Sequence, residues 1–205
     1  MPSPNKTVSF ANYALHVLEH VYEPAEDSFL FAENLAVKKG ESVLDMGTGC
    51  GILGIIAAEK AAKVVAVDIN PYAIRCAKEN AKLNGVADKM FFVQGNLFTS
   101  IKIGETFDLI TFNAPYLPSE PSKAKSWLER AWDGGVGGRQ VIDGFICEAP
   151  QYLKRNGCIL LMQSTLSGVD ETLEDFAEKG LEASIIAKRD LPFFETIVLF
   201  KAKWK

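Results

Sequence analysis

The chain has 205 residues, of which 48% are hydrophobic and 23% charged, and its 22 Lys and Arg against 26 Asp and Glu give a formal charge of −4. This composition is typical of one globular domain, here residues 1–205, and its negative charge gives no general attraction to nucleic acid or to an anionic membrane. The N-terminus lacks an apolar signal core and no apolar run could span a bilayer, so we expect a cytoplasmic protein with its four cysteines reduced.

In chain order, an N-terminal arm over residues 1–24 precedes a regular alternation of strands and helices. Strands are expected near 42–45, 63–68, 89–94, 107–112, 158–164, 181–188 and 195–202. Helices are expected near 25–37, 52–61, 71–83, 139–154 and 170–179. The alternation predicts an α/β fold, a seven-stranded and mostly parallel sheet with helices on both faces. Because the last two strands are joined by too few residues for a crossover helix, they should form a C-terminal antiparallel hairpin.

The N-terminal arm contains a literal metal-binding pattern. His16, Glu19 and His20 spell H-x-x-E-H, which binds zinc when the two histidines lie one turn apart on a helix, and a helix is plausible here. The chain has no other histidine and no marked third ligand. We therefore favour a polar face of the arm with no metal, and keep a metal-dependent hydrolase as a distant alternative.

The segment S-V-L-D-M-G-T-G-C-G-I-L-G (42–54) reads as a strand, a tight turn and the start of a helix. Gly49, Gly51 and Gly54 match the G-x-G-x-x-G pattern of dinucleotide-binding proteins. In that fold a pyrophosphate rests on the helix N-terminus, where negative charge is favourable. Asp45, placed at the entrance to the loop, would repel a pyrophosphate. The pattern alone therefore gives the wrong ligand.

The same acidic residue suits a ligand with a positively charged amino group and no phosphate, which describes S-adenosylmethionine. Asp45 would then face the amino group, while Gly47, Gly49 and Gly51 let the backbone approach the methionine part. Asp68, at the end of the next strand, would accept both ribose hydroxyls. On the third strand Asn96 would face the adenine ring, although a polar turn residue is nearly as good an interpretation of Asn96 alone.

The fourth strand, F-D-L-I-T-F (107–112), is followed by N-A-P-Y (113–116). A planar amide or nucleobase nitrogen is a poor nucleophile because its lone pair is delocalised. Two acceptors on its two N–H bonds would orient it and favour the pyramidal form that attacks a methyl group. The side-chain oxygen of Asn113 and the backbone carbonyl of Ala114 can be these acceptors, with Pro115 restricting the geometry and Tyr116 stacking on the planar group.

At this point the sequence resembles a known family. D-M-G-T-G-C-G followed by N-A-P-Y is similar to the class I methyltransferases that modify planar nitrogens, and three further stretches narrow the resemblance: Y-E-P-A-E-D-S-F (22–29), V-D-I-N-P (67–71) and A-W-D-G-G-V-G-G-R-Q-V-I-D (131–143). Together they resemble the archaeal and eukaryotic branch of the HemK family. The resemblance implies a Rossmann-like methyltransferase that acts on the N5 atom of the glutamine in the Gly-Gly-Gln loop of class I release factors.

The resemblance also implies a set of site residues. The residues expected to bind S-adenosylmethionine are Ser28, Asp45, Gly47, Thr48, Gly49, Gly51, Asp68, Ile69, Asn96, Leu97 and Asn113. Asn113, Ala114, Pro115 and Tyr116 are expected to bind the substrate amide. The chain departs from the family at Ala114, where proline is usual, and at Asn96, where aspartate is more usual. Glu26 and Asp27 would suit the first turn of any helix without having a function, and only the resemblance suggests that this stretch is functional.

The resembling branch works with a small zinc-binding activator subunit. In the usual strand order of this fold, 89–94 is an edge strand, and its M-F-F-V run (90–93) is wholly apolar. Burial under helices on both faces explains that run without a partner. We nevertheless hypothesise that the edge docks the activator by strand addition.

The closest alternative function is methylation of a nucleic-acid amino group, because adenine N6 offers the same planar nitrogen. Such enzymes commonly use a target-recognition region and a basic groove. The insert over 117–138 has a mixed surface instead, in which the charged residues are Lys123, Lys125, Arg130, Arg139, Glu120, Glu129 and Asp133. Its two tryptophans, Trp127 and Trp132, fit a substrate lid and an anchor to the core equally well.

Overall fold

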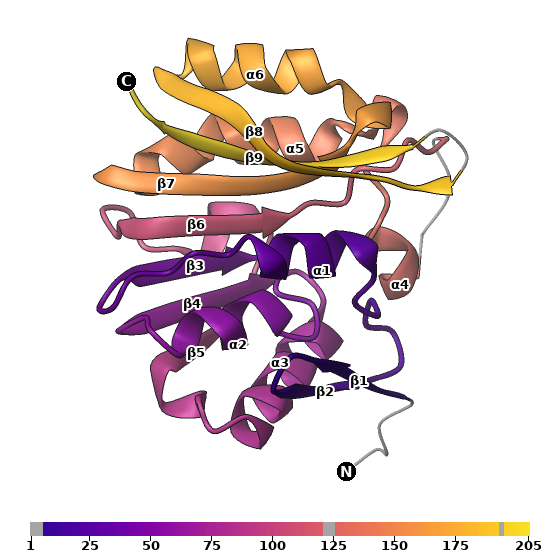
Figure 1. Ribbon diagram of the computed structural model, residues 1–205, viewed down its shortest axis with the longest axis vertical. Helices are drawn as coiled ribbons and strands as arrows, with labels where there is room; N and C mark the ends of the chain where they lie inside the picture. The colour runs from indigo at the N-terminus through magenta and orange to yellow at the C-terminus, as the bar shows by residue number, and fades with distance from the viewer. Residues whose placement is uncertain (1–5, 121–125, 193–194) are drawn as a thin grey trace.

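The computed structural model of the chain describes residues 6–120, 126–192 and 195–205 (Figure 1). Its strands are β1 (Lys6–Phe10), β2 (Tyr13–Val17), β3 (Ser42–Met46), β4 (Lys63–Asp68), β5 (Met90–Gln94), β6 (Phe107–Asn113), β7 (Leu153–Ser164), β8 (Leu181–Asp190) and β9 (Thr196–Trp204). Its α-helices are α1 (Glu26–Glu33), α2 (Ile52–Ala58), α3 (Pro71–Leu83), α4 (Trp127–Arg130), α5 (Gln140–Glu148) and α6 (Val169–Glu178).

Within the described residues, the main sheet has seven strands in the order β5-β4-β3-β6-β7-β9-β8. The first five are parallel, and β9 is antiparallel to both β7 and β8. The predicted α/β class, the parallel sheet and the C-terminal hairpin are confirmed, and β5 is an edge strand as expected. Because β3 and β6 are adjacent, the glycine-rich loop after β3 and the N-A-P-Y segment after β6 emerge side by side at the carboxyl edge.

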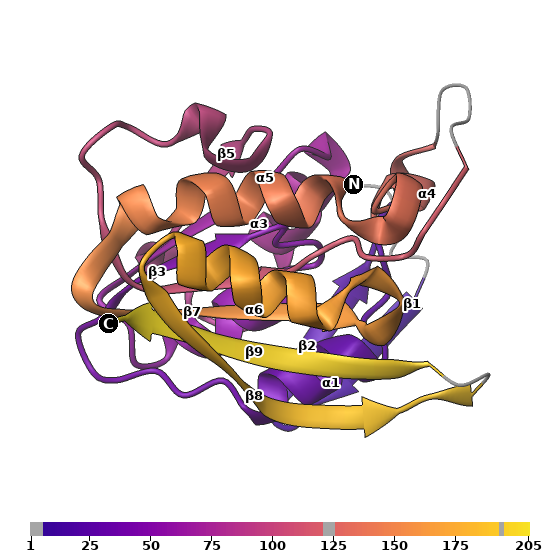
Figure 2. The same cartoon turned by 90° about the horizontal axis from the view of Figure 1, so that it is seen from above.

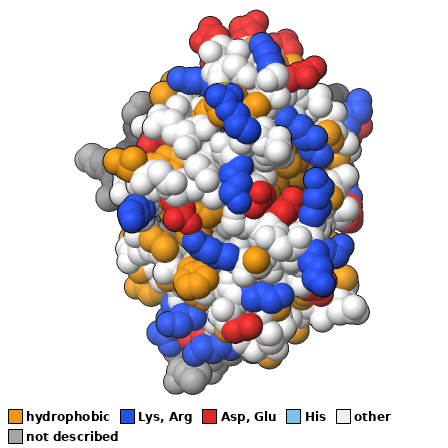
Figure 3. Space-filling view, turned by 90° about the vertical axis from the view of Figure 1, so that its left-hand side faces the viewer, with side chains coloured by type: hydrophobic (Ala, Val, Ile, Leu, Met, Phe, Trp, Pro, Cys, Tyr) orange, Lys and Arg blue, Asp and Glu red, His pale blue; other side chains and the backbone are white. Residues whose placement is uncertain are grey.

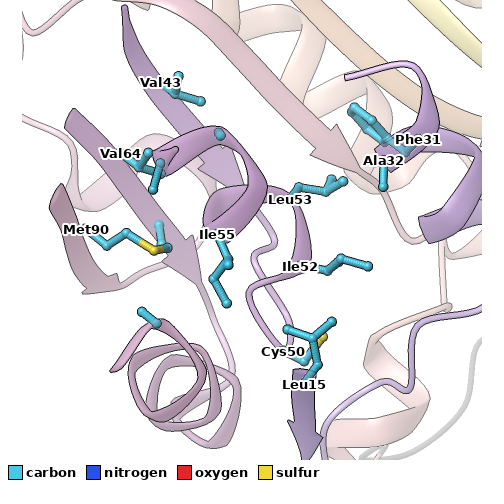
Figure 4. Close-up of a cluster of buried hydrophobic side chains, with 14 of the residues drawn as sticks. Leu15, Phe31, Ala32, Val43, Cys50, Ile52, Leu53, Ile55, Val64 and Met90 are labelled. Atoms are coloured by element: carbon cyan, nitrogen blue, oxygen red, sulfur yellow. The ribbon is translucent and has the colours of Figure 1, made fainter. Parts of the chain in front are cut away.

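The sheet separates two apolar cores, because successive strand residues point to opposite faces. Val43 of β3 belongs to the core under α1, α2 and α3, while its neighbour Leu44 belongs to the core under α5 and α6. Val64 and Val65 of β4 divide in the same way. Figure 2 shows α1 and α5 on opposite sides of the sheet, and Figure 4 shows part of the first core. The near-continuous apolar strands of the sequence follow from this double coverage.

The N-terminal arm differs from expectation. Residues 6–17 form the antiparallel hairpin β1–β2 beside α3, outside the main sheet. Asn80 and Asn84 of α3 supply hydrogen bonds to the free edge of β2, with their Oδ1 atoms accepting from the backbone N–H groups of His16 (2.8 Å) and Ala14 (3.2 Å). The helix considered for H-x-x-E-H is therefore wrong, because His16 lies in a strand and His20 has a φ of 69° in the following turn.

Three predicted helices are shorter than expected, and the one expected over 52–61 is α2, which ends at Ala58. The helix expected over 25–37 is α1, which ends at Glu33. The helix expected over 139–154 ends at Glu148, and a 3₁₀ turn containing Pro150 leads directly into β7 at Leu153. Proline cannot continue the hydrogen bonding of an α-helix, which explains the early end. No helix of the described residues is long and apolar enough to cross a membrane. All four cysteines are free.

Candidate functional site

A cavity of about 780 Å³ opens at the carboxyl ends of β3, β4 and β6, and it is lined by residues of α1 and of the described part of the insert. Open α/β sheets place their ligands at this edge. The predicted site residues that line the cavity are Ser28, Gly47, Thr48, Gly49, Asp68, Ile69, Asn96, Leu97, Asn113, Ala114, Pro115 and Tyr116. Asp45 and Gly51 are not among the lining residues.

Asp45 lies behind the glycine loop. Its side chain is buried and accepts hydrogen bonds from the hydroxyls of Thr48 (2.6 Å) and Thr111 (2.9 Å) and from the backbone N–H of Gly54 (3.0 Å). Burial raises the pKa of Asp45 to about 6, against the lowering effect of these donors. Asp45 therefore does not lie on the cavity wall, where the sequence predicted it to face the donor's amino group: its contacts fix the loop from behind and position Thr48 on the wall.

Gly51 also has a packing role. It precedes α2 with a φ of 92°, and a Cβ there would lie 3.1 Å from the Cα of Ala77 on α3. The close approach of α2 and α3 therefore requires glycine at this position. Gly47 and Gly49, with φ of 64° and 56°, do line the cavity. A ligand in the cavity can therefore approach the backbone closely at Gly47 and Gly49, but not at Gly51, the third glycine for which this was predicted.

Asp68 ends β4 at the cavity wall. Its Oδ2 accepts from the backbone N–H of Gly49 (2.9 Å) and its Oδ1 from that of Asn70 (2.9 Å). Each carboxylate oxygen can accept a second hydrogen bond, so both remain able to bind a diol. Burial raises the pKa of Asp68. Farther along the wall, Leu97 follows Asn96 with a φ of 47°, a backbone conformation that side chains rarely adopt.

The other end of the cavity is built around Asn113. Its Nδ2 donates to Asp27 Oδ2 at 3.0 Å and to Ser28 Oγ at 3.4 Å. Its Oδ1 is buried and has no hydrogen-bond partner among the described residues. Buried polar atoms are rarely left unsatisfied, and an exception calls for an explanation such as a bound ligand. The two donors of the amide are fixed by α1, so its acceptor is left for a molecule in the cavity.

Asp27 connects several residues of this end. Besides Asn113, it accepts hydrogen bonds from the backbone N–H of Ser28 (2.6 Å) and from the hydroxyls of Tyr22 (3.3 Å) and Tyr116 (3.4 Å). Burial, and then the charge of Asp27, raise the pKa of both tyrosines, so the phenols stay protonated and continue to donate. The sequence signal for Asp27 was ambiguous because an acidic residue in the first turn of a helix needs no function.

Part of the cavity wall comes from the insert and from the start of α5. Trp127, Arg130, Trp132, Asp133 and Gln140 line the cavity, so both tryptophans face the space predicted for substrate. Lys123 and Lys125 of the predicted mixed surface lie outside the described residues. Among the residues that the structure describes, no group of three or more His, Cys, Asp or Glu side chains is arranged to hold a metal ion.

The sequence and the fold are similar to those of known methyltransferases. A family model described as ribosomal protein L11 methyltransferase (PrmA) matches residues 14–114. A Methanocaldococcus jannaschii protein assigned as a protein N5-glutamine methyltransferase is 46% identical over 181 residues, which cover 87% of this chain and 90% of the relative. The human methyltransferase HEMK2 is 32% identical over 82% of this chain and 83% of its own. Among solved structures, the Mtq2-Trm112 complex of E. cuniculi, described as methylating the translation termination factor eRF1, matches with a TM-score of 0.69 and 24% identity over 91% of this chain and 99% of that chain.

Proposed function

The chain belongs to the HemK family of protein glutamine methyltransferases, and on that premise we propose that it methylates the side-chain amide nitrogen of the glutamine in the Gly-Gly-Gln loop of a class I release factor, with S-adenosylmethionine as the donor. Relatives of this chain are named as methyltransferases, two of them as glutamine methyltransferases, and this supports the reaction class. The observation that carries the substrate chemistry is the unpartnered Oδ1 of Asn113. A primary amide brings the N–H group that this acceptor lacks.

The site can orient such an amide without forming a covalent bond to it. Asp27 and Ser28 hold the Nδ2 group of Asn113, which fixes the orientation of the amide and leaves its acceptor, Oδ1, without a partner among the described residues and available to the substrate. The Ala114 carbonyl, on the next residue of the cavity wall, is the second acceptor. Two acceptors on the two N–H bonds favour the pyramidal nitrogen of the transition state over the planar ground state, which raises turnover more than binding.

Donor and substrate occupy opposite ends of the cavity in this proposal. S-adenosylmethionine, when bound, supplies an electrophilic methyl group on a sulfonium. The backbone of Gly47 and Gly49, with the Asp68 carboxylate, would hold it at the carboxyl ends of β3 and β4. Tyr116, held by Asp27, presents its ring beside the substrate amide. Trp127 and Trp132 cover this end of the cavity and limit the access of water.

The proposal is tested by incubating the chain, alone and together with the family's activator subunit, with a Gly-Gly-Gln-containing release factor and isotopically labelled donor, with DNA in a parallel reaction. We expect a single added methyl group, located by mass spectrometry on the glutamine of that loop. A release factor in which this glutamine is replaced by asparagine is the matched control. Label incorporated into DNA and not into the release factor would contradict the proposal. The cytoplasmic location stays a prediction from the sequence.

A nucleic-acid substrate is less consistent with the charges. Of the charged residues described along the cavity, Asp27, Asp68 and Asp133 are acidic and Arg130 is basic. Many of the Lys and Arg side chains, mixed with Asp and Glu, appear instead on the side where β4 and β7 begin, away from the cavity (Figure 3). Two of the lysines there, Lys63 and Lys154, are paired with Glu105 and Asp108. The described residues that line the cavity therefore do not form the basic groove that base flipping would need.

We also propose that edge strand β5 docks a small zinc-binding activator subunit. Phe91 of this strand is 54% exposed, so burial on both faces does not account for its apolar side chain. Mixing the chain with the family's activator should give a heterodimer, which Phe91→Glu should abolish. Ile185→Glu, on the opposite edge strand β8, should leave the heterodimer intact. A chain that is monodisperse and fully active alone would count against this docking.

A further inference from the structure

The glycine-rich segment over 131–138 lies directly against the backbone of residues 116–119, which begin with the last residue of N-A-P-Y. Leu117 donates its N–H to the Trp132 carbonyl and accepts from the Gly134 N–H, both at 2.9 Å, and Ser119 donates to the Gly135 carbonyl at 3.0 Å. Gly138 is buried with a φ of 73°, and a Cβ there would overlap the Tyr116 carbonyl oxygen. The segment after β6 is thus held in place by residues 131–138, and their close approach requires glycine at position 138.

Arg139, the next residue, fixes that neighbour to the rest of the fold. Its side chain is 17% exposed, and its Nη1 donates to the carbonyls of Ser167 (2.8 Å) and Gly168 (2.6 Å) and to the Thr172 hydroxyl (2.9 Å). Its Nη2 pairs with Asp175 at 2.6 Å and with Asp143 at 2.8 Å. One guanidinium therefore joins the insert to the turn between β7 and α6.

The groups that accept hydrogen bonds from Arg139 are themselves held by further hydrogen bonds. The Gln163 amide in β7 donates to the Ser167 and Gly168 carbonyls and accepts from the Thr172 hydroxyl, so the groups that receive Arg139 are fixed from below. Strand β7 also pairs with β6, whose last residue is Asn113. The N-A-P-Y segment is therefore connected to the turn after β7 in two ways, through the pairing of β6 with β7 and through Gly138 and Arg139.

We propose that Arg139 is a positioning residue for methyl transfer: through Gly138 it sets the backbone of residues 114–116, and with it the direction of the Ala114 carbonyl. The inference rests on the proposed function for its catalytic consequence. Reacting groups must be held to within a fraction of an ångström, and a misplacement of about 1 Å can lower the rate roughly 100-fold. The donor end of the cavity does not contact Arg139, so donor binding is independent of it.

The test compares Arg139→Ala with Asp143→Asn, which removes one exposed partner of the same guanidinium. Arg139→Ala should lower kcat for a Gly-Gly-Gln peptide by about 30- to 100-fold, with donor affinity within about twofold of wild type. Guanidinium ion at low millimolar concentration should restore part of kcat to Arg139→Ala, because it replaces the missing group. Asp143→Asn should turn over like wild type.

Hydrogen exchange supplies a readout that does not depend on the substrate. Arg139→Ala should increase exchange at the amides of Tyr116, Leu117, Ser119 and residues 134–138 and leave those of 47–51 unchanged. A variant that melts earlier but keeps wild-type kcat and exchange would overturn the inference, as would a loss of donor affinity equal to the loss of kcat. If the wild-type chain, with the activator subunit present, does not methylate the release factor, the proposed function fails, while the exchange pattern still tests the role of Arg139.

Discussion

The two ends of the cavity are built in different ways. The donor end is made by short, consecutive pieces of chain, the loop from β3 to α2 and the end of β4, held by contacts such as Gly49 N–H to Asp68. The substrate end brings together residues that are far apart in the sequence: Asp27, Asn113 and Gly138 come from α1, β6 and the insert. The donor end is therefore a local motif, whereas the substrate end exists only after the whole sheet has formed.

This comparison predicts that a change at each end affects a different kinetic quantity. At the substrate end, Asn113→Ala should lower turnover by roughly 100- to 1000-fold, because its preorganised acceptor acts in the transition state. Donor affinity, measured by calorimetry, should be nearly unchanged. Asn113→Asp should be almost as poor, since its charge pairs with the donor in the ground state and the Nδ2 contacts with α1 are lost.

Ala114→Pro is the matched control, because it keeps the carbonyl and only stiffens the backbone, so turnover should be close to wild type. Near-wild-type turnover in a folded, donor-saturated Asn113→Ala protein would exclude the proposed role of Asn113.

The same difference explains how much the sequence could predict. The strands of the main sheet, the sheet class and the glycine loop follow from local periodicity and turn chemistry, and Asp68 and Asn113 could be placed because strand ends converge. Asp45 could not be placed correctly, since its side chain could face either the cavity or the region beneath α2. The hub at Asp27 and the anchor at Arg139 depend on tertiary contacts between residues 86 and 36 positions apart, which no local pattern reveals.

At the donor end, Asp68→Ala should weaken donor binding by about 2–3 kcal/mol, or roughly 30- to 150-fold. The carboxylate provides acceptors for the ligand and also fixes the Gly49 N–H. Turnover at saturating donor should fall much less than the affinity does. Calorimetry on Asp68→Ala beside Asp88→Ala, an exposed acid elsewhere, measures the effect. Unchanged donor affinity in Asp68→Ala would remove this residue from the site.

Asp27→Asn tests whether the substrate end is assembled through α1. The substitution keeps the volume but replaces a charged acceptor by a neutral one, so turnover should fall by roughly 10- to 100-fold. Donor affinity should change only slightly. Glu26→Gln is the control, because Glu26 lies in the same helical turn and is paired with Arg189 on the surface. Equal turnover in the two variants would show that Asp27 does not position Asn113.

The smallest effect on activity is expected at Asp45, and it concerns stability and pH. Burial raises the pKa of Asp45 from 3.8 to about 6, so the folded protein binds a proton that the unfolded chain releases. A group with a raised folded pKa stabilises fully below its unfolded value, and that contribution is lost as the pH rises through the folded value. Between about pH 4 and pH 6 the loss should be on the order of 3 kcal/mol.

Asp45→Asn should remove this contribution, because the amide does not ionise and can still accept from Thr48 and Gly54. Urea denaturation of the two proteins from pH 4 to pH 8 should give stability curves whose difference changes between about pH 4 and pH 6 and is constant above pH 6, with the wild type losing more stability as the pH rises. Donor affinity should stay within about threefold, since Asp45 acts behind the loop, and a larger loss would place its carboxylate in contact with the donor after all. That outcome would make the donor end depend on a buried charge as strongly as the substrate end depends on Asp27.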